Sequence, residues 1–205
     1  MTSDRISAAI YDPFLWLGER AGMARTRARL LASASGRVLE IGAGTGLNLR
    51  HYPDTVDELV LSEPVEAMAR RLERRTRRRR IDAHVVRAAA DTLPFTDATF
   101  DTVVSTLVLC TVEHPGRALA ELRRVLRPGG RLLFIEHVRA DAPRLARWQD
   151  RLERPWCSFA AGCRANRPTV EAIAGAGLTL DRLEHGRWRG MPPIVAPLAI
   201  GTATS

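Results

Sequence analysis

The sequence predicts an α/β protein built on a doubly wound, largely parallel sheet, and three observations support this class. Short apolar segments alternate with segments of helical length through residues 36–138, the order that parallel strands with covering helices produce. A glycine-rich turn directly follows the first of these strands, where open α/β sheets bind their ligands. The 205 residues are 45% hydrophobic and 26% charged, which is typical of a globular chain with a sizeable core.

The predicted elements follow one another in a regular order. Residues 5–34 have helical apolar spacing, interrupted near Asp12-Pro13 and Gly18. Short apolar or β-branched runs predict strands at residues 38–41, 59–62, 84–87, 101–105 and 131–138, the fourth continuing as an apolar run to Leu109. Amphipathic spacing predicts helices at residues 47–51, 65–78 and 117–126.

The last third of the chain departs from this rhythm after the breaker cluster Pro128-Gly129-Gly130 and the fifth strand. Residues 141–163 are rich in Trp, Arg and Pro. A helix is expected at residues 167–176, followed by two final strands at residues 178–183 and 194–202. No internal repeat or low-complexity linker divides the chain, so we expect one domain.

The net charge of +8 is concentrated in one segment. Between Arg70 and Arg80, eight arginines and the single acid Glu73 sum to +7, which leaves 8 − 7 = +1 for the other 194 residues. This run contains no aromatic residue, so it lacks the stacking groups that single-strand nucleic-acid binders use. We interpret the run as a solvated helix face and expect no nucleic-acid partner, with a phosphate-binding patch as the alternative.

Composition also bears on location and on metal binding. No apolar stretch reaches the ~18 residues of a membrane span, and residues 1–10 lack a signal-peptide pattern. The three cysteines, Cys110, Cys157 and Cys163, fit neither a disulfide framework nor paired zinc-ligand spacing, since Cys157 and Cys163 have no third ligand nearby in sequence. We therefore expect a reduced, cytoplasmic protein with no metal site.

The segment from Glu40 to Gly46 carries the most specific chemical signal. Its three alternating glycines let the backbone turn tightly and approach a ligand closely, and the helix expected after it would favour a negative group. A dinucleotide-binding motif has a glycine at its sixth position, which is Leu47 here. Glu40 would also repel the pyrophosphate of a dinucleotide. S-adenosylmethionine has an ammonium group for Glu40 and no phosphate. The motif therefore favours S-adenosylmethionine over NAD.

The chain resembles the class I S-adenosylmethionine-dependent methyltransferases, of the type 11 or UbiE-like kind, over nearly its whole length. Four segments in the family's order carry the resemblance: Val38–Gly46, Leu61–Pro64, Leu93–Asp101 and Glu121–Gly130. The resemblance implies a Rossmann-like, doubly wound, seven-stranded sheet that is mostly parallel with an antiparallel C-terminal edge strand. It divides the domain into a helical lid, a cofactor-binding core and an acceptor side with the last two strands, at residues 1–34, 35–140 and 141–205.

The resemblance also implies how the cofactor is held, with S-adenosylhomocysteine as the product. The glycines would surround its methionine moiety, Glu40 would face its ammonium group and Glu63 its ribose hydroxyls. Because Ala88-Ala89 stand where many relatives have a glycine followed by an acid, Asp91 is the expected substitute at the adenine. The expected cofactor contacts are Glu40, Gly42, Gly44, Gly46, Glu63, Pro64, Met68, Ala90, Asp91, Thr106 and Leu107.

A finer resemblance, to the thiol S-methyltransferases of animal endoplasmic reticulum and their bacterial kin, concerns the acceptor. It is carried by Thr106–Val112, Glu136-His137, Trp148-Gln149, Pro155–Cys163 and Arg167. The animal enzymes have an N-terminal hydrophobic anchor that this chain lacks, which favours a soluble version. We expect S-methylation of a small thiol or sulfide, with N- or O-methylation of a lipid, quinone precursor or natural product as the alternative.

Several side chains are candidates for the acceptor site. His137, just beyond the fifth strand, is the candidate catalytic base for a thiol whose reference pKa is ~8.5; a structural histidine is the alternative, and His114 is a weaker candidate. The candidate substrate-pocket residues are Tyr11, Cys110, Trp148, Trp156 and Trp188, with Phe159 and Met191 beside them. Cys110 could instead be a small buried apolar residue. Tyr11, Phe14 and Trp16 would form a lid.

Three functions from other classes compete with this interpretation. A nicotinamide-dependent dehydrogenase is disfavoured by Leu47. An RNA methyltransferase would use the arginine run and bind with a steep salt dependence. A non-catalytic partner-binding relative is disfavoured by the intact glycine motif. The sequence leaves the acceptor and the oligomeric state open.

Overall fold

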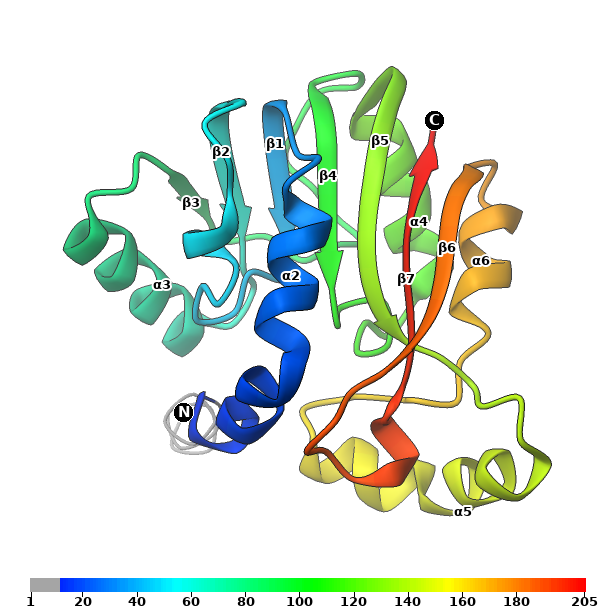
Figure 1. Ribbon diagram of the computed structural model, residues 1–205. Coiled ribbons are helices and arrows are strands. Elements are labelled where there is room, and N and C mark those ends of the chain that lie inside the picture. Colours follow the sequence, from blue (N-terminus) through cyan, green and yellow to red (C-terminus); the bar gives the residue numbers. More distant parts are fainter. Residues whose placement is uncertain (1–11) are drawn as a thin grey trace.

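The computed structural model describes residues 12–205 (Figure 1), so the candidate pocket residue Tyr11 lies outside the described part. Seven strands form one sheet in the order β3-β2-β1-β4-β5-β7-β6. Their bounds are β1 Gly36–Ile41, β2 Val56–Ser62, β3 His84–Val86, β4 Phe100–Thr106, β5 Leu126–His137, β6 Thr179–Arg187 and β7 Pro197–Thr204. The predicted doubly wound, mostly parallel sheet is confirmed.

The central strands of the sheet are parallel, and their buried residues pair in register. In the centre, Leu39 pairs with Val60 of β2 and with Val103 of β4, all in parallel strands. Strand β7 runs antiparallel between β5 and β6. The antiparallel C-terminal strand therefore lies one place in from the edge, which β6 occupies.

Helices cover the two faces of the sheet. Their bounds are α2 Ala24–Leu31, α3 Glu66–Arg79, α4 Pro115–Val125, α5 Pro143–Phe159 and α6 Thr169–Gly175. Consecutive strand residues pack on opposite faces: Val38 joins a core with residues of α2 and α3, and Leu39 joins a core with residues of α4 and α6. Figure 1 shows α2 in front of the sheet and α4 and α6 behind it. Sequence alternation of buried apolar residues thus explains the doubly wound arrangement.

Helix α5 is a feature that the Trp-, Arg- and Pro-rich composition of residues 141–163 concealed. Pro143 stands in its first turn, where its missing N–H is not needed. Pro155 lies inside the helix near its C-terminal end, a position that reads as a breaker in the sequence. Figure 1 places α5 across the carboxyl ends of the parallel strands, so this helix forms one wall of the region where a ligand is expected.

Two local expectations need correction. The helix predicted at residues 47–51 is only a 3-10 turn, Leu49–His51, because Tyr52 is extended ahead of Pro53. A full helix therefore does not follow the glycine loop directly. Strand β4 ends at Thr106 instead of continuing to Leu109, because Leu107 has a left-handed φ of 61°. The chain therefore leaves the sheet at Leu107, just after the carboxyl end of β4.

The N-terminal helical segment also differs from its prediction. Residues 12–18 are helical, and the chain continues without a break at Gly18 through a π-helical turn, Glu19–Met23, into α2. The irregularity lies at Gly22, whose φ is 142°, a value that glycine adopts readily. Among residues 12–205, no helix combines the length and apolarity needed to cross a membrane.

Candidate active site

The glycine loop after β1 has the backbone shape that its sequence predicts. Gly44 and Gly46 have φ values of 58° and 83°, which residues with a Cβ atom adopt only at a cost in conformational free energy. A Cβ on Gly46 would also lie 2.6 Å from Leu49 Cδ1 and 2.7 Å from Leu72 Cδ1. The glycines therefore permit both the turn and its close packing against α3.

Glu63 ties this loop to the end of β2. Its Oε2 accepts the N–H of Gly44 at 2.8 Å, and its Oε1 accepts the N–H of Val65 at 2.9 Å. Burial raises the pKa of Glu63, and these two backbone donors oppose that rise. Pro64 follows as an exposed residue and Met68 is buried on α3. The carboxylate is thus held beside the loop where the ribose contact was predicted.

Glu40 lies fully inside the protein at the end of β1. Its Oε1 accepts Asn48 Nδ2 at 2.9 Å and its Oε2 accepts the Tyr52 hydroxyl at 2.7 Å. Burial raises the pKa of Glu40 to about 7, with the Tyr52 and Asn48 hydrogen bonds opposing the shift. A carboxylate in this state is desolvated and ready to gain from a cationic ligand.

A buried polar network extends from Glu40 to the N-terminal helices, and no motif in the sequence predicts it as a whole. Asn48 also donates to Thr106 Oγ1 at 3.0 Å and accepts Arg27 Nη1 at 2.9 Å. Arg27 pairs in turn with Glu19 at 3.0 Å, both being buried. Of these residues, only Glu40 and Thr106 are among the cofactor contacts expected from the sequence. Asn48 and Tyr52 carry one detectable signal, which is their position just after the glycine motif.

Glu136 organises the loop that follows β4. It is fully buried, and its Oε1 accepts the Ser105 hydroxyl at 2.6 Å and the N–H groups of Val108 at 3.0 Å and Leu109 at 3.1 Å. Its Oε2 accepts the N–H of Cys110 at 3.3 Å. Four donors, one hydroxyl at the end of β4 and three N–H groups of the loop that follows it, therefore converge on one carboxylate. This carboxylate fixes the position of Cys110.

His137 occupies the end of β5, as its sequence position suggested. Burial lowers the pKa of His137 to about 4, opposed by hydrogen bonding to the carbonyls of Pro197 and Val195. The ring stacks on Trp188 with 5.6 Å between centroids, and its Nδ1 is buried with no hydrogen-bond partner. The imidazole is thus neutral at pH 7 and a weak base.

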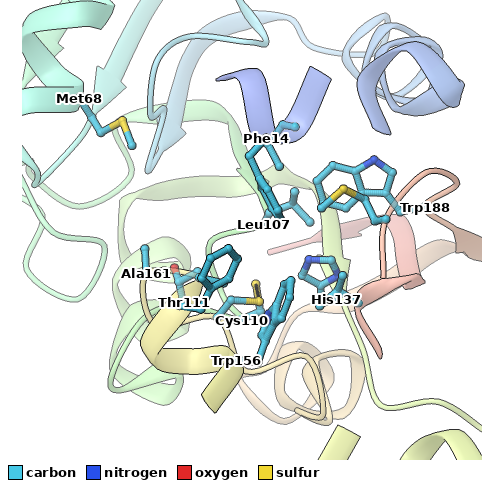
Figure 2. Close-up of a pocket in the computed structure, with 15 residues that line it drawn as sticks. Phe14, Met68, Leu107, Cys110, Thr111, His137, Trp156, Ala161 and Trp188 are labelled. Carbon is cyan, nitrogen blue, oxygen red and sulfur yellow. Dashed lines mark hydrogen bonds between the residues drawn. The ribbon is translucent and has the colours of Figure 1, made fainter. Parts of the chain in front are cut away.

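An apolar cavity of about 160 Å³ lies beyond the ends of β4 and β5. Figure 2 shows Cys110, His137 and Trp156 grouped in its wall, with Met68 set apart on the α3 side. Among residues 12–205, no Asp, Glu or Arg lines this cavity. The lining residues are Phe14, Leu15, Met68, Leu107, Cys110, Thr111, His137, Trp156, Phe159, Ala160, Ala161, Cys163, Trp188, Met191 and Val195.

The N-terminal helical segment covers this cavity. Asp12 accepts a hydrogen bond from Thr45 of the glycine loop and forms an ion pair with Arg75 of α3. Phe14 meets Phe159 of α5 edge to face, with 5.7 Å between ring centroids. Trp16 instead points to solvent and lies under Arg20. Contacts of Asp12 and Phe14 therefore place this segment over both the glycine loop and the cavity.

The structure does not bring all the candidate residues together. Trp148 is 53% exposed on α5, stacks with Arg151 and is not part of the cavity wall, so its predicted pocket role is not supported by its placement. Ala90 and Asp91 lie in the loop after β3 and do not line the cavity. His114 is exposed before α4. These positions reflect helix phase and loop path, which short motifs do not specify.

Cys163 is a site residue that sequence spacing missed. Its Sγ lies 3.9 Å from the Sγ of Cys110, although the two residues are 53 positions apart. In the sequence, Cys157 is the cysteine nearest to Cys163, and spacing alone does not predict that Cys110 lies beside Cys163. In the fold, Cys110 and Cys163 lie beside His137, and all three are buried.

The arginine run lies on the solvent side of α3. Met68, Ala69, Leu72 and Thr76 form the buried stripe of this helix. Most of the arginines face outward, and Arg70 and Arg77 form i,i+4 ion pairs with Glu66 and Glu73. This placement agrees with a solvated helix face.

Comparison with known proteins identifies the family. A family described as "Methyltransferase domain" matches residues 39–134. The thiol S-methyltransferase TMT1B of Homo sapiens is 36% identical over 176 residues, covering 83% of this chain and 70% of its own. A phosphatidylethanolamine N-methyltransferase of Cereibacter sphaeroides is 35% identical over 147 residues, covering 71% of this chain and 72% of its own.

Solved structures agree with the fold. A Thermotoga maritima structure described as an S-adenosylmethionine-dependent methyltransferase, possibly a histamine N-methyltransferase, superposes with a TM-score of 0.73. It is 21% identical and covers 100% of this chain and 99% of its own. Together with the glycine loop after β1 and the buried Glu40 and Glu63 beside it, these relationships show that the chain belongs to the class I S-adenosylmethionine-dependent methyltransferases.

Proposed function

We propose that the protein transfers the methyl group of S-adenosylmethionine to the sulfur of a small, apolar thiol. The observation that carries this proposal is the neutral, apolar cavity beyond β4 and β5. A volume of about 160 Å³ corresponds to roughly five water molecules at ~30 Å³ each, so it suits a small acceptor. Since none of the described residues in its wall is an Asp, Glu or Arg, it favours an uncharged acceptor. The 36% identity to a thiol S-methyltransferase supports the same acceptor class.

The residues around the glycine loop would hold the cofactor. In this proposal Glu40 faces the ammonium group and Glu63 the ribose hydroxyls, while Gly42, Gly44 and Gly46 surround the methionine moiety. Thr106 holds Asn48 against Glu40. Further contacts are assigned to Pro64, Met68, Ala90, Asp91 and Leu107. Met68 and Leu107 also line the cavity, which supports a shared wall between cofactor and acceptor.

The reaction is a displacement in which this chain mainly supplies alignment and water exclusion. The acceptor thiol loses its proton, its sulfur forms a bond to the methyl carbon, and the bond from that carbon to the sulfonium breaks. S-adenosylhomocysteine and a methyl thioether are the products. Because burial makes His137 a weak base, we propose that the thiol proton passes to solvent and that the His137 ring forms part of the wall around the acceptor.

A matched panel of acceptors tests the proposal. Thiophenol, phenol and aniline have nearly the same shape and differ in the atom that would be methylated. Incubation of each with protein and S-adenosylmethionine, followed by mass spectrometry, is expected to give methylated thiophenol far above the other two. Methylation of phenol or aniline without thiophenol would refute the S-methyltransferase assignment.

A lipid acceptor is the second candidate, and a specific surface feature favours it. Phe14, Trp16, Leu17 and Phe159 are exposed by 39–64% on the segments that cover the cavity. The relative named phosphatidylethanolamine N-methyltransferase matches most of this chain. Vesicles containing phosphatidylethanolamine are assayed beside thiophenol to decide between the two acceptor classes. A gain of one methyl group by the lipid would support the lipid acceptor, and methylated thiophenol would support the thiol.

Trp156 tests the location of the acceptor. Truncating it to alanine removes a large apolar wall from the cavity, so the KM for thiophenol is expected to rise roughly tenfold, the equivalent of losing ~1.4 kcal/mol of apolar contact. Trp148→Ala on the same helix is the matched control, because Trp148 lies outside the cavity. Steady-state kinetics should show an unchanged KM for the control; equal effects of both substitutions would place the acceptor elsewhere.

A further inference from the structure

We propose that Cys110, His137 and Cys163 form a three-ligand site for zinc or a similar thiophilic metal ion, open toward the apolar cavity. One ligand atom from each residue lies within 4.8 Å of the other two. The residues come from three separate parts of the fold: the loop after β4, the end of β5 and the turn after α5. Their convergence is therefore a property of the tertiary structure.

The distances suit a tetrahedral ion. Zinc lies about 2.3 Å from a thiolate and about 2.1 Å from an imidazole nitrogen, so bound sulfurs are about 3.8 Å apart. The two sulfurs are 3.9 Å apart here, close to that value. This separation is far longer than the ~2.05 Å S–S bond of a disulfide, and both cysteines are free. Small side-chain rotations would bring the nitrogen within reach of the same ion.

A second, independent observation is the state of the His137 ring. The residue is 96% buried, since its exposed fraction is 4%, yet its Nδ1 has no hydrogen-bond partner within the described part of the chain. The carbonyls of Val195 and Pro197 lie close enough to the ring to favour its protonated form, and a backbone carbonyl is a common second partner of a metal-bound histidine. A buried polar atom without a partner is costly, and a metal ion in the cavity wall would satisfy it.

The surroundings hold the ligands in place and suit their charge. The Glu136 carboxylate holds the backbone of Cys110, the Cys110 carbonyl accepts the N–H of Arg164 at 2.8 Å, and the carbonyl of His137 accepts the Thr169 hydroxyl at 3.0 Å. Two thiolates and a neutral imidazole around a divalent ion give no net charge before an acceptor binds, which suits a buried site. Two sulfurs and one nitrogen form a donor set that favours zinc or another soft metal over magnesium or calcium.

Three protein ligands leave a fourth position open, as in catalytic zinc sites. All three residues line the cavity, so this position faces the space assigned to the acceptor. On the proposed thiol S-methyltransferase function, the acceptor thiol takes this position and releases its proton to solvent. The sulfur, bound as a thiolate, then attacks the methyl carbon, and the resulting thioether dissociates because it binds the ion more weakly. This step supplies the thiolate without a strong base.

Cobalt titration of the reduced, metal-free protein tests the site without acceptor or cofactor. We expect one equivalent of Co²⁺ to bind with sulfur-to-cobalt charge-transfer absorption, two protons to be released, and the absorption to be lost in Cys110→Ser and Cys163→Ser. His137→Gln should weaken binding and change the d–d bands. Cys157→Ser is the matched control and should behave as the parent, because Cys157 is outside the cluster. Circular dichroism and S-adenosylhomocysteine binding verify that each variant is folded.

The outcomes separate this inference from the proposed function. Absence of sulfur-to-cobalt absorption, or its persistence in the Cys110→Ser/Cys163→Ser double variant, would overturn the metal site. Full thiol methylation by protein that elemental analysis shows to be free of metal would also overturn it, while leaving the function in place. Stoichiometric metal binding by a protein that methylates phenol but not thiophenol would retain the site and refute the thiol acceptor.

Discussion

Replacement of Glu136 by glutamine is expected to lower the free energy of unfolding by about 2 to 4 kcal/mol, because the buried carboxylate accepts four hydrogen bonds from the end of β4 and the loop after it. An amide retains one accepting oxygen but turns its NH₂ group toward the N–H of Cys110. Two donors then face each other in the interior, where neither can reach water. For a domain of this size the loss corresponds to a fall in Tm of roughly 5 to 15 °C.

Chemical denaturation of the two proteins side by side measures this effect. Glu113→Gln is the matched control, since Glu113 lies near the same loop but is exposed and should change stability by less than ~0.5 kcal/mol. Ser105→Ala, which removes one of the four donors, should have an intermediate effect. Wild-type stability in Glu136→Gln would show that the carboxylate does not hold this loop.

Replacement of Glu40 by glutamine is expected to weaken S-adenosylmethionine binding by about 10- to 100-fold, the range for losing a charge-assisted hydrogen bond in a buried site. The substitution keeps the side-chain shape but removes the negative charge proposed to face the ammonium group. Isothermal titration calorimetry of each protein measures the change. Asp54→Asn, which removes one exposed negative charge nearby, is the control and should leave the Kd unchanged. Equal Kd values for Glu40→Gln and wild type would remove Glu40 from the ammonium site.

The pH dependence of binding provides an independent check. Because burial places the pKa of Glu40 at about 7 in the free protein, the carboxyl is largely protonated at pH 6 and ionised at pH 8. An ammonium ligand binds the ionised form, so wild-type affinity should rise with pH through this window, by at most tenfold per unit. Glu40→Gln should show no such rise. A wild-type Kd that is constant between pH 6 and pH 8 would contradict the shifted pKa.

Stability should respond to pH in the opposite direction. The pKa of Glu40 rises from 4.5 to about 7 on folding, so the native protein holds this proton more tightly than the unfolded chain. The contribution of Glu40 to stability is therefore greatest below pH 4.5 and is lost as the pH rises toward 7. Denaturation of the cofactor-free protein at several pH values should show this loss, and Glu40→Gln should lack this component. A bound cation would offset it.

The sequence alone predicted the sheet, its mostly parallel strands and the cofactor loop, because these depend on local properties. Alternating apolar residues define each strand, and the spacing from Gly42 to Gly46 sets the backbone of the loop. Family resemblance added the antiparallel C-terminal strand. Where local signals conflicted, prediction failed: Pro155 concealed the helical nature of α5, and Pro53 shortened the helix expected after the glycine loop.

The acceptor side depended on tertiary structure. Trp148 and Trp156 belong to the same helix and lie close in sequence, yet only Trp156 lines the cavity, because helix phase and docking decide which face turns inward. Cys163 reaches Cys110 and His137 only after α5 has packed across the strand ends. Short-range patterns in the chain therefore determined the fold and the cofactor loop, whereas the long-range packing of separate elements determined which side chains share the cavity.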